Sequence, residues 1–117
     1  LHNLTDTDNL NVVAFEKETM DKLGLIPEIA PRYRATYFSH IIGGYAAGYY
    51  SYLWAEVLDT DAFEAFKEHG VFDKNTADSF RKNILEKGGT EDPMTLYRGF
   101  RGADPSLEPL LKNRGLK

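Results

Sequence analysis

The sequence predicts an all-α protein of five to six helices. Apolar side chains recur every three or four residues in several segments, which is the period of a buried helix face. No segment alternates apolar and polar residues for long enough to indicate a strand. The helical segments are also bounded by capping residues, glycine or proline. We expect residues 1–117 to form a single helical domain, since this length supports one modest core.

The first half contains two expected helices. One carries apolar residues from Leu10 to Met20, with a cap at residues 6–8 and Gly24 beyond its end. Prolines at 27 and 31 then indicate a linker, because the residue before proline disfavours helix. After an aromatic-rich stretch and a pair of glycines, a second helix is expected over residues 45–58.

The second half contains the remaining elements. Thr60 or Asp61 is expected to start a short new helix that ends at Gly70. A polar turn then leads to a helix that ends at the glycine pair 88–89. Asp-Pro at 92–93 and again before Leu107 predicts two further helix starts, each with an Asp cap and proline in the first turn.

Composition argues against several classes of partner. The net charge is −4 and the basic residues are scattered, whereas nucleic-acid binding requires a concentrated basic surface. No apolar run approaches the roughly 18 residues of a membrane span. We therefore expect neither nucleic acid nor a membrane as partner.

Metal and nucleophile motifs are also missing. His2, His40 and His69 are far apart in the sequence, and no His-Glu-x-x-His pair is present, so no metal site is expected in this chain. Ser39 is adjacent to His40, but neighbouring residues do not form a nucleophile and base pair.

Tyrosines supply the most informative pattern. Tyr45, Tyr49 and Tyr52 are spaced i, i+4 and i+7, so a continuous α-helix would place them on one face, away from Tyr50. The face either packs in a core, with its hydroxyls bonded to the backbone, or lines a wet cleft. Burying each hydroxyl without a partner would cost about 1–3 kcal/mol.

Residues 32–66 resemble the carboxy-terminal region of the zinc peptidase family of thimet oligopeptidase, oligopeptidase A and peptidyl-dipeptidase. The pattern H-x-x-G-G-Y-x-A-x-Y-Y-x-Y carries the resemblance, which extends over nearly the whole chain. The resemblance implies that the chain is the C-terminal fragment of a helical, clam-shaped peptidase with a deep channel for short peptides. It also implies a zinc ion held by a His-Glu-x-x-His helix and a downstream Glu, which this chain lacks.

The resemblance assigns roles to individual residues. Tyr52 matches the phenol that donates a hydrogen bond to the oxyanion, a task that suits phenols because their pKa of about 10 keeps them protonated at neutral pH. Tyr45 matches a loop tyrosine that contacts bound peptide, and His40 matches a histidine that holds the substrate backbone. We expect one catalytic residue, Tyr52, and as substrate-binding residues His40, Gly43, Gly44, Tyr45 and Tyr49.

The same resemblance sets the expected cofactor and partners. Zinc belongs to the parent enzyme, and the isolated chain should bind none and be inactive. Its partners would be short peptide substrates and the missing metal-binding half, and the fragment alone should self-associate. A cytoplasmic parent is expected, or a periplasmic one if it carries a signal peptide.

Two other interpretations stay open. The chain would instead be a free-standing interaction module whose tyrosine face binds a peptide or helix. It would otherwise be a structural helical domain without a site. The glycine pair beside the tyrosines favours the peptidase fragment, because a packed bundle does not need it.

Overall fold

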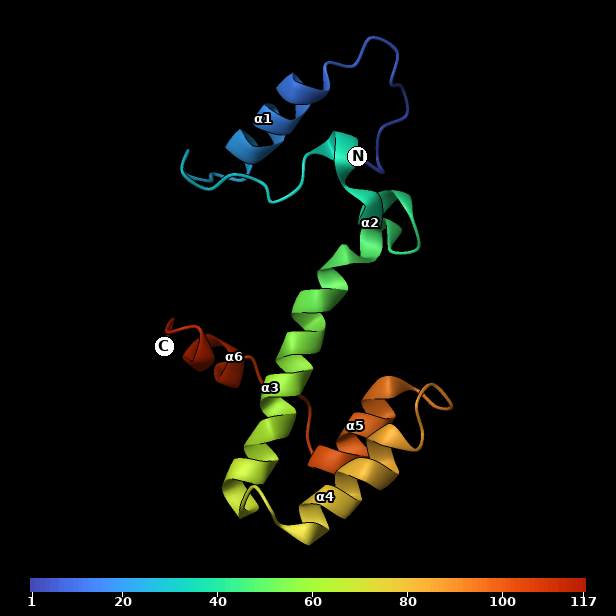
Figure 1. Cartoon of the computed structure of the whole chain (residues 1–117), viewed down its shortest axis with the longest axis vertical. Coiled ribbons are helices and arrows are strands. Elements are labelled where there is room, and N and C mark those ends of the chain that lie inside the picture. The colour runs from blue at the N-terminus through green and yellow to red at the C-terminus, as the bar shows by residue number, and fades with distance from the viewer. The chain divides into compact units, whose positions relative to one another are not determined.

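The computed structural model describes residues 1–117 and contains six α-helices and no strand, so the all-α prediction is confirmed (Figure 1). Two 3₁₀-helices (η1 and η2) and a π-helical turn (η3) complete the elements. In chain order they are α1 (Val12–Lys22), η1 (Ala35–Tyr37), α2 (Ser39–Ile42), η2 (Ala46–Tyr50), α3 (Ser51–His69), α4 (Lys74–Phe80), η3 (Arg81–Leu85), α5 (Pro93–Arg101) and α6 (Glu108–Asn113).

The chain divides into two compact units, residues 1–50 and residues 51–117. The first unit contains α1, η1, α2 and η2, and none of these elements has a buried residue. The second unit contains α3 to α6 and the buried apolar side chains. These are Val57, Ala62, Ala65, Leu96, Tyr97 and Leu110.

Helix α1 begins one residue after Asn11, whose side-chain oxygen accepts the backbone N–H of Ala14 at 3.0 Å. The prediction of a cap at residues 6–8 is therefore wrong. Asp6 instead accepts the N–H of Asp8 at 2.9 Å, which closes a local turn before the helix. Gly24 follows the helix with φ of +69°, as the predicted end requires.

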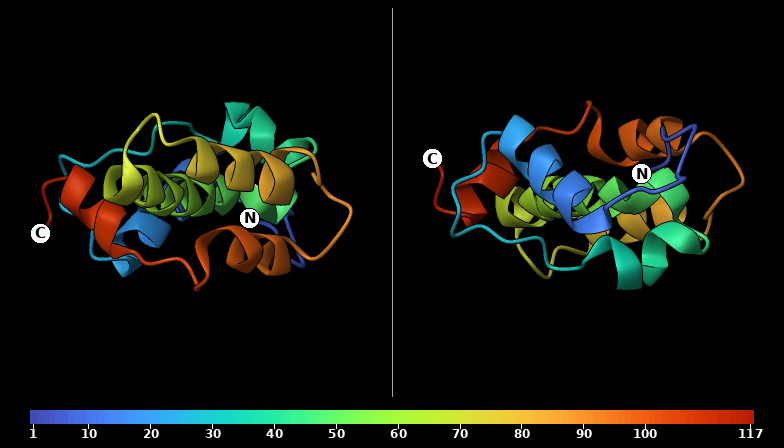
Figure 2. Two further views of the ribbon diagram at one scale, coloured as in Figure 1. Left: turned by 90° about the horizontal axis from the view of Figure 1, so that it is seen from below. Right: turned by 90° about the horizontal axis from the view of Figure 1, so that it is seen from above.

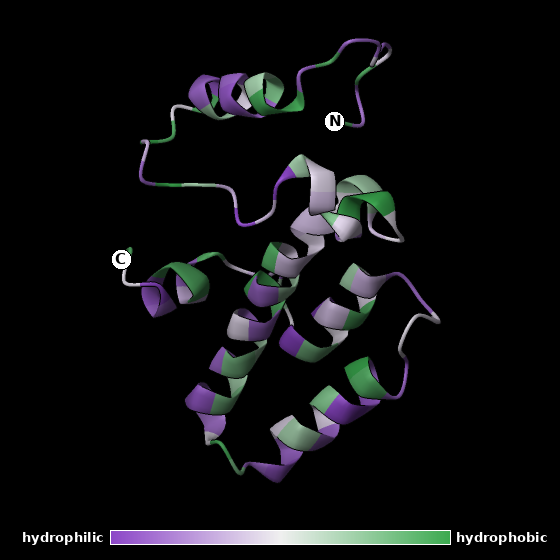
Figure 3. Ribbon diagram, turned by 45° about the horizontal axis from the view of Figure 1, so that its top comes forward, coloured by the Kyte–Doolittle hydropathy of each residue, from purple (hydrophilic) through white to green (hydrophobic).

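Helix α3 is continuous through Thr60, so the predicted break there is wrong. The Thr60 hydroxyl donates to the Glu56 carbonyl at 2.8 Å, a bond that keeps threonine compatible with a helix interior. The Asp61 carboxylate does not cap a helix, because it accepts hydrogen bonds from other parts of the unit. Hydropathy colouring shows polar and apolar residues interleaved along this helix (Figure 3).

Seen almost along α3, the later helices of the second unit are arranged around it (Figure 2). Helix α4 starts at the Asp73 cap and continues into η3, where the Glu86 N–H reaches back five residues to the Arg81 carbonyl at 2.9 Å. Three phenylalanine rings from α3, α4 and α5 then meet with centroids 5.1–6.4 Å apart: Phe66, Phe80 and Phe100.

The two Asp-Pro pairs differ in outcome. Asp92 caps α5 by accepting the Thr95 N–H at 2.9 Å, with Pro93 in the first turn, so that prediction is confirmed. The second prediction is wrong, because Asp104 accepts from the Arg98 guanidinium at 2.6 Å and α6 begins only at Glu108.

None of the helices combines the length and apolar character that a bilayer crossing requires.

Candidate functional site

His40 lies at the centre of a group of aromatic rings in the first unit. It belongs to the short helix α2, and its ring centroid is 5.7 Å from that of Tyr45 and 5.3 Å from that of Tyr49. The rings of Tyr33 and Phe38 lie at 5.6 and 5.8 Å. We call these five residues the aromatic cluster. Three of them are substrate-binding residues predicted from the sequence, and the structure brings those three together.

Tyr33 and Phe38 were not predicted as site residues. Their rings stack at 5.0 Å, and Phe38 meets Tyr49 edge-to-face at 4.7 Å with an interplanar angle of 88°. Their signal in the sequence is the aromatic-rich stretch that precedes the glycine pair. Such a stretch alone does not tell which rings turn towards His40.

The two glycines between His40 and Tyr45 differ in what they require. Gly43 ends α2 with its N–H donating to the Ser39 carbonyl at 2.9 Å, and a Cβ added there would lie 3.3 Å from that carbonyl oxygen. A Cβ on Gly44 would meet nothing within 4 Å. Neither glycine has a positive φ, whereas Ala46 does, at +46°. Close approach to the helix backbone is thus the reason for glycine at position 43.

The predicted single helical face of Tyr45, Tyr49 and Tyr52 is wrong. Tyr45 precedes η2, Tyr49 lies within that 3₁₀-helix, and only Tyr52 belongs to an α-helix. The geometry of three residues per turn and the left-handed Ala46 change the register that an α-helix would give. A tight turn, in which the Gly48 N–H donates to the Tyr45 carbonyl at 2.6 Å, replaces the regular face.

Tyr52 lies in the first turn of α3 and is 50% exposed. The buried residues Val57, Asp61 and Ala65 follow it by five, nine and thirteen positions. At about 100° per residue they project between about 140° and about 220° from Tyr52. The phenol therefore points away from the core of its own unit.

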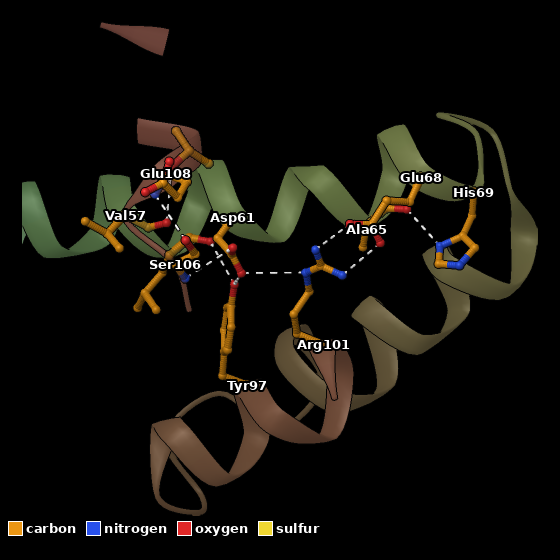
Figure 4. Close-up of polar contacts among 11 residues, drawn as sticks. Val57, Asp61, Ala65, Glu68, His69, Tyr97, Arg101, Ser106 and Glu108 are labelled. Carbon is orange, nitrogen blue, oxygen red and sulfur yellow. Dashed lines mark hydrogen bonds and ion pairs between the residues drawn. The ribbon is translucent and has the colours of Figure 1, made fainter. Parts of the chain in front are cut away.

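A buried carboxylate joins three segments of the second unit (Figure 4). Asp61 is 5% exposed and accepts the Tyr97 hydroxyl at 2.5 Å and the Ser106 N–H at 3.2 Å. The Nε of Arg101 is 3.6 Å from the same carboxylate, and its Nη1 and Nη2 bind Glu68 at 3.0 and 2.7 Å. We call these residues the Asp61 network.

Burial raises the pKa of the Tyr97 phenol well above its usual range, and the hydrogen bond to Asp61 raises it further. The hydrogen bond from Arg101 holds the pKa of Glu68 below its ordinary value. Both shifts favour the protonation states that form the network at neutral pH.

The Asp61 network is structural in character. It borders a cavity of about 470 Å³, lined by Asp61, Glu64, Glu68, Arg101, Ser106, Glu108, Pro109, Lys112 and Lys117. Carboxylates of this cavity pair with nearby cations, for example Glu68 with Arg101 and Glu108 with Lys117. Sequence reasoning missed the network because Tyr97 is 36 positions from Asp61.

The residues present do not fit a zinc ion. No group of three or more His, Asp or Glu side chains is placed to hold a metal. His69 is engaged through its Nδ1 with the Ala65 carbonyl at 2.9 Å, and His40 is surrounded by the aromatic cluster.

Comparison with known proteins gives the relatives of this chain. It is 57% identical over 81 residues to oligopeptidase A of Escherichia coli strain K12, which covers 68% of this chain and 12% of that protein. It is 43% identical over 118 residues to oligopeptidase A of Haemophilus influenzae, covering 99% of this chain and 17% of the relative. Dipeptidyl carboxypeptidase of Escherichia coli strain K12 is 44% identical over 114 residues, covering 97% and 16% respectively.

The chain thus spans less than a fifth of the length of these relatives. The model of peptidase family M3 matches residues 1–116, which is nearly the entire sequence. The resemblance found in the tyrosine and glycine pattern is confirmed, and this chain belongs to peptidase family M3.

Proposed function

We propose that this chain is the substrate-binding and transition-state-stabilising part of a larger zinc peptidase that cleaves short peptides. The observation that carries the proposal is the position of Tyr52 on α3. Its phenol is half exposed and faces away from the core of the second unit, so core packing there does not account for it.

In the proposed reaction Tyr52 donates a hydrogen bond to the oxygen that becomes negatively charged when the peptide carbonyl is attacked. A neutral donor fixed on a long helix is well suited to this task, since it requires little reorganisation as charge develops. The 19 residues of α3 and the Asp61 network, nine positions from Tyr52, supply the rigid support.

His40, Tyr45 and Tyr49 are the proposed contacts for the peptide itself. The printed names of the relatives, oligopeptidase A and dipeptidyl carboxypeptidase, support a peptide substrate. An imidazole and two phenols offer both hydrogen bonds for a peptide backbone and ring surface for its side chains. Gly43 and Gly44 would let the segment between them adjust to a bound peptide.

Zinc would be held by residues outside this chain, because no suitable ligand group is present within it. We therefore propose that the isolated chain does not hydrolyse peptides. Its activity would depend on the metal-binding part of the parent enzyme.

The test is Tyr52→Phe in the full-length peptidase that contains this segment. Removing one donor to the transition state lowers kcat by about 10²–10³ while KM changes little. Steady-state kinetics on a quenched fluorescent peptide measures both constants. Tyr50→Phe is the matched control, because Tyr50 is two residues away and 72% exposed, and it should leave kcat unchanged.

A core role for Tyr52 gives the opposite result. The phenylalanine variant would then lose about 1 kcal/mol of stability and keep its turnover. Unchanged kcat with a lowered melting temperature would contradict the proposal.

A second candidate is a module that binds a peptide or helix without catalysis. Large side chains exposed at the start of α3 favour it, namely Tyr52, Leu53 and Trp54, which are 44–52% exposed. In the peptidase proposal the same side chains would contact the missing half of the parent or another copy of the fragment. Purified full-length protein without peptidase activity would favour the module.

A further inference from the structure

Phe38 contacts more members of the aromatic cluster than its exposed neighbours suggest. Its ring stacks on Tyr33 at 5.0 Å and lies edge-on to Tyr49 at 4.7 Å and to His40 at 5.8 Å. It is thus the shared neighbour of two proposed peptide-contact residues. The residue has no hydrogen-bonding group of its own, so any effect on substrate must pass through these rings.

The other side of Phe38 faces a different environment. Together with Tyr33 it lines an apolar cavity of about 200 Å³ whose walls come from α1, η1 and nearby residues: Leu1, Phe15, Glu16, Thr19, Met20, Pro31 and Ala35. The Phe38 ring therefore separates this cavity from His40 and Tyr49. Truncating the ring would extend the cavity towards them and leave both rings free to shift.

Ring geometry explains how Phe38 could set orientation. Aromatic pairs prefer stacked or edge-to-face arrangements because ring edges are positive and ring faces negative. The interplanar angles of 88° to Tyr49 and 64° to His40 belong to the edge-to-face class. An aliphatic side chain of similar volume would fill the space but would not impose these angles.

We infer that Phe38 is a positioning residue for peptide binding, which acts by holding the rings of His40 and Tyr49 in the orientation that contacts substrate. The inference rests on the proposed function, because it assumes that His40 contacts the peptide. It adds a residue with no role in the predicted site.

The experiment is a double-mutant cycle of Phe38→Ala and His40→Ala in the full-length peptidase, with a quenched fluorescent peptide as substrate. Misplacing a contact residue should raise KM for Phe38→Ala roughly tenfold, with a smaller change in kcat. In the His40→Ala background the same substitution should raise KM less than about twofold, because its target is already missing. Phe38→Leu, which keeps most of the volume, should give an intermediate KM.

Phe72→Ala is the matched control, since Phe72 is 98% exposed and lies in the second unit, and its KM should equal that of the wild type. Circular dichroism and thermal melting establish that each variant is folded. If Phe38→Ala does not fold, the Leu variant decides, because a KM equal to that of the wild type would overturn the inference.

Two outcomes separate the inference from the proposed function. If His40→Ala raises KM but folded Phe38 variants do not, the positioning role fails and the proposed function stands. If the effect of Phe38→Ala is the same with and without His40, Phe38 acts independently and the inference also fails. If neither His40→Ala nor Tyr45→Phe changes KM or kcat, the proposed function itself is wrong.

Discussion

At the scale of single residues, the stability of the second unit depends on one buried carboxylate. Burying a charge is costly unless hydrogen bonds and an opposite charge compensate it. Asp61 has both, from the Tyr97 hydroxyl, the Ser106 N–H and the nearby Arg101 guanidinium. Because these donors come from α5 and the segment after it, each of them ties α3 to a different part of the chain.

Removing the Tyr97 hydroxyl should therefore destabilise the protein. Tyr97→Phe leaves a buried carboxylate with one donor fewer, which costs about 1.5–3 kcal/mol for a hydrogen bond to a charged group. Urea unfolding followed by circular dichroism measures the change. Tyr37→Phe, at a position that is 60% exposed, is the control and should stay within about 0.5 kcal/mol of the wild type. Equal loss in both variants would contradict the role given to Asp61.

The same hydrogen bond predicts a dependence on alkaline pH. Burial and Asp61 raise the pKa of Tyr97 in the folded state above the value of about 10 expected in the unfolded chain. The protonated phenol is thus favoured by folding, so its contribution is complete below pH 10 and declines as pH rises above it. The difference in unfolding free energy between wild type and Tyr97→Phe should be constant from pH 7 to 9 and shrink by pH 11. A difference that grows above pH 10 would have the wrong sign.

The candidate site was partly predictable at this scale. His40, Tyr45 and Tyr49 were singled out by their pattern, and the structure places their rings together. Phe38 could not be predicted, because nothing in its immediate sequence shows which rings it contacts. Asp61 was read as a helix start because Asp is a good cap, and its actual partners are too distant in sequence to be seen.

At the scale of elements, α3 is the longest helix and the main support of the proposed catalytic phenol. Local signals predicted its end near Gly70 but also a break at Thr60, where polar residues interrupt the apolar pattern. The break is absent because Thr60 bonds to the preceding turn and Asp61 is satisfied by tertiary contacts. The Asp92 cap was predictable because its partner is only three residues away.

A proline at position 60 distinguishes a continuous helix from two short ones. In the interior of α3, Thr60→Pro removes a backbone hydrogen bond and clashes with the preceding turn, at a cost of about 3 kcal/mol or more. At the first position of a new helix, proline would be tolerated. Chemical denaturation measures the cost, and Thr60→Ala controls for loss of the hydroxyl. Equal stability of the Pro and Ala variants would contradict a continuous α3.

At the scale of the whole molecule, the core is confined to one unit. The buried apolar residues all lie within residues 51–117, whereas the elements of residues 1–50 bury none. This distribution could not be predicted from hydropathy, because both halves have apolar residues at helical spacing. We had expected a single domain over residues 1–117, and the following prediction tests whether the two units fold together.

We expect residues 51–117 to fold without residues 1–50. The shortened chain should show helical circular dichroism and a cooperative melt within about 5 °C of the corresponding transition in the full chain, equivalent to about 1 kcal/mol. The control is the shortened chain with Tyr97→Phe, which should melt at a lower temperature. Loss of the cooperative transition would show that the two units form a single folding domain.

The central claim, that Tyr52 stabilises a transition state, is tested most directly by the binding of a transition-state analogue. In the full-length peptidase, a peptide with a tetrahedral phosphinate in place of the scissile amide should bind Tyr52→Phe about 10²–10³-fold more weakly than wild type. Its affinity should fall by the same factor as kcat/KM, while a product peptide should bind both proteins equally well. An unchanged affinity for the phosphinate, or an equal loss for phosphinate and product, would contradict the account.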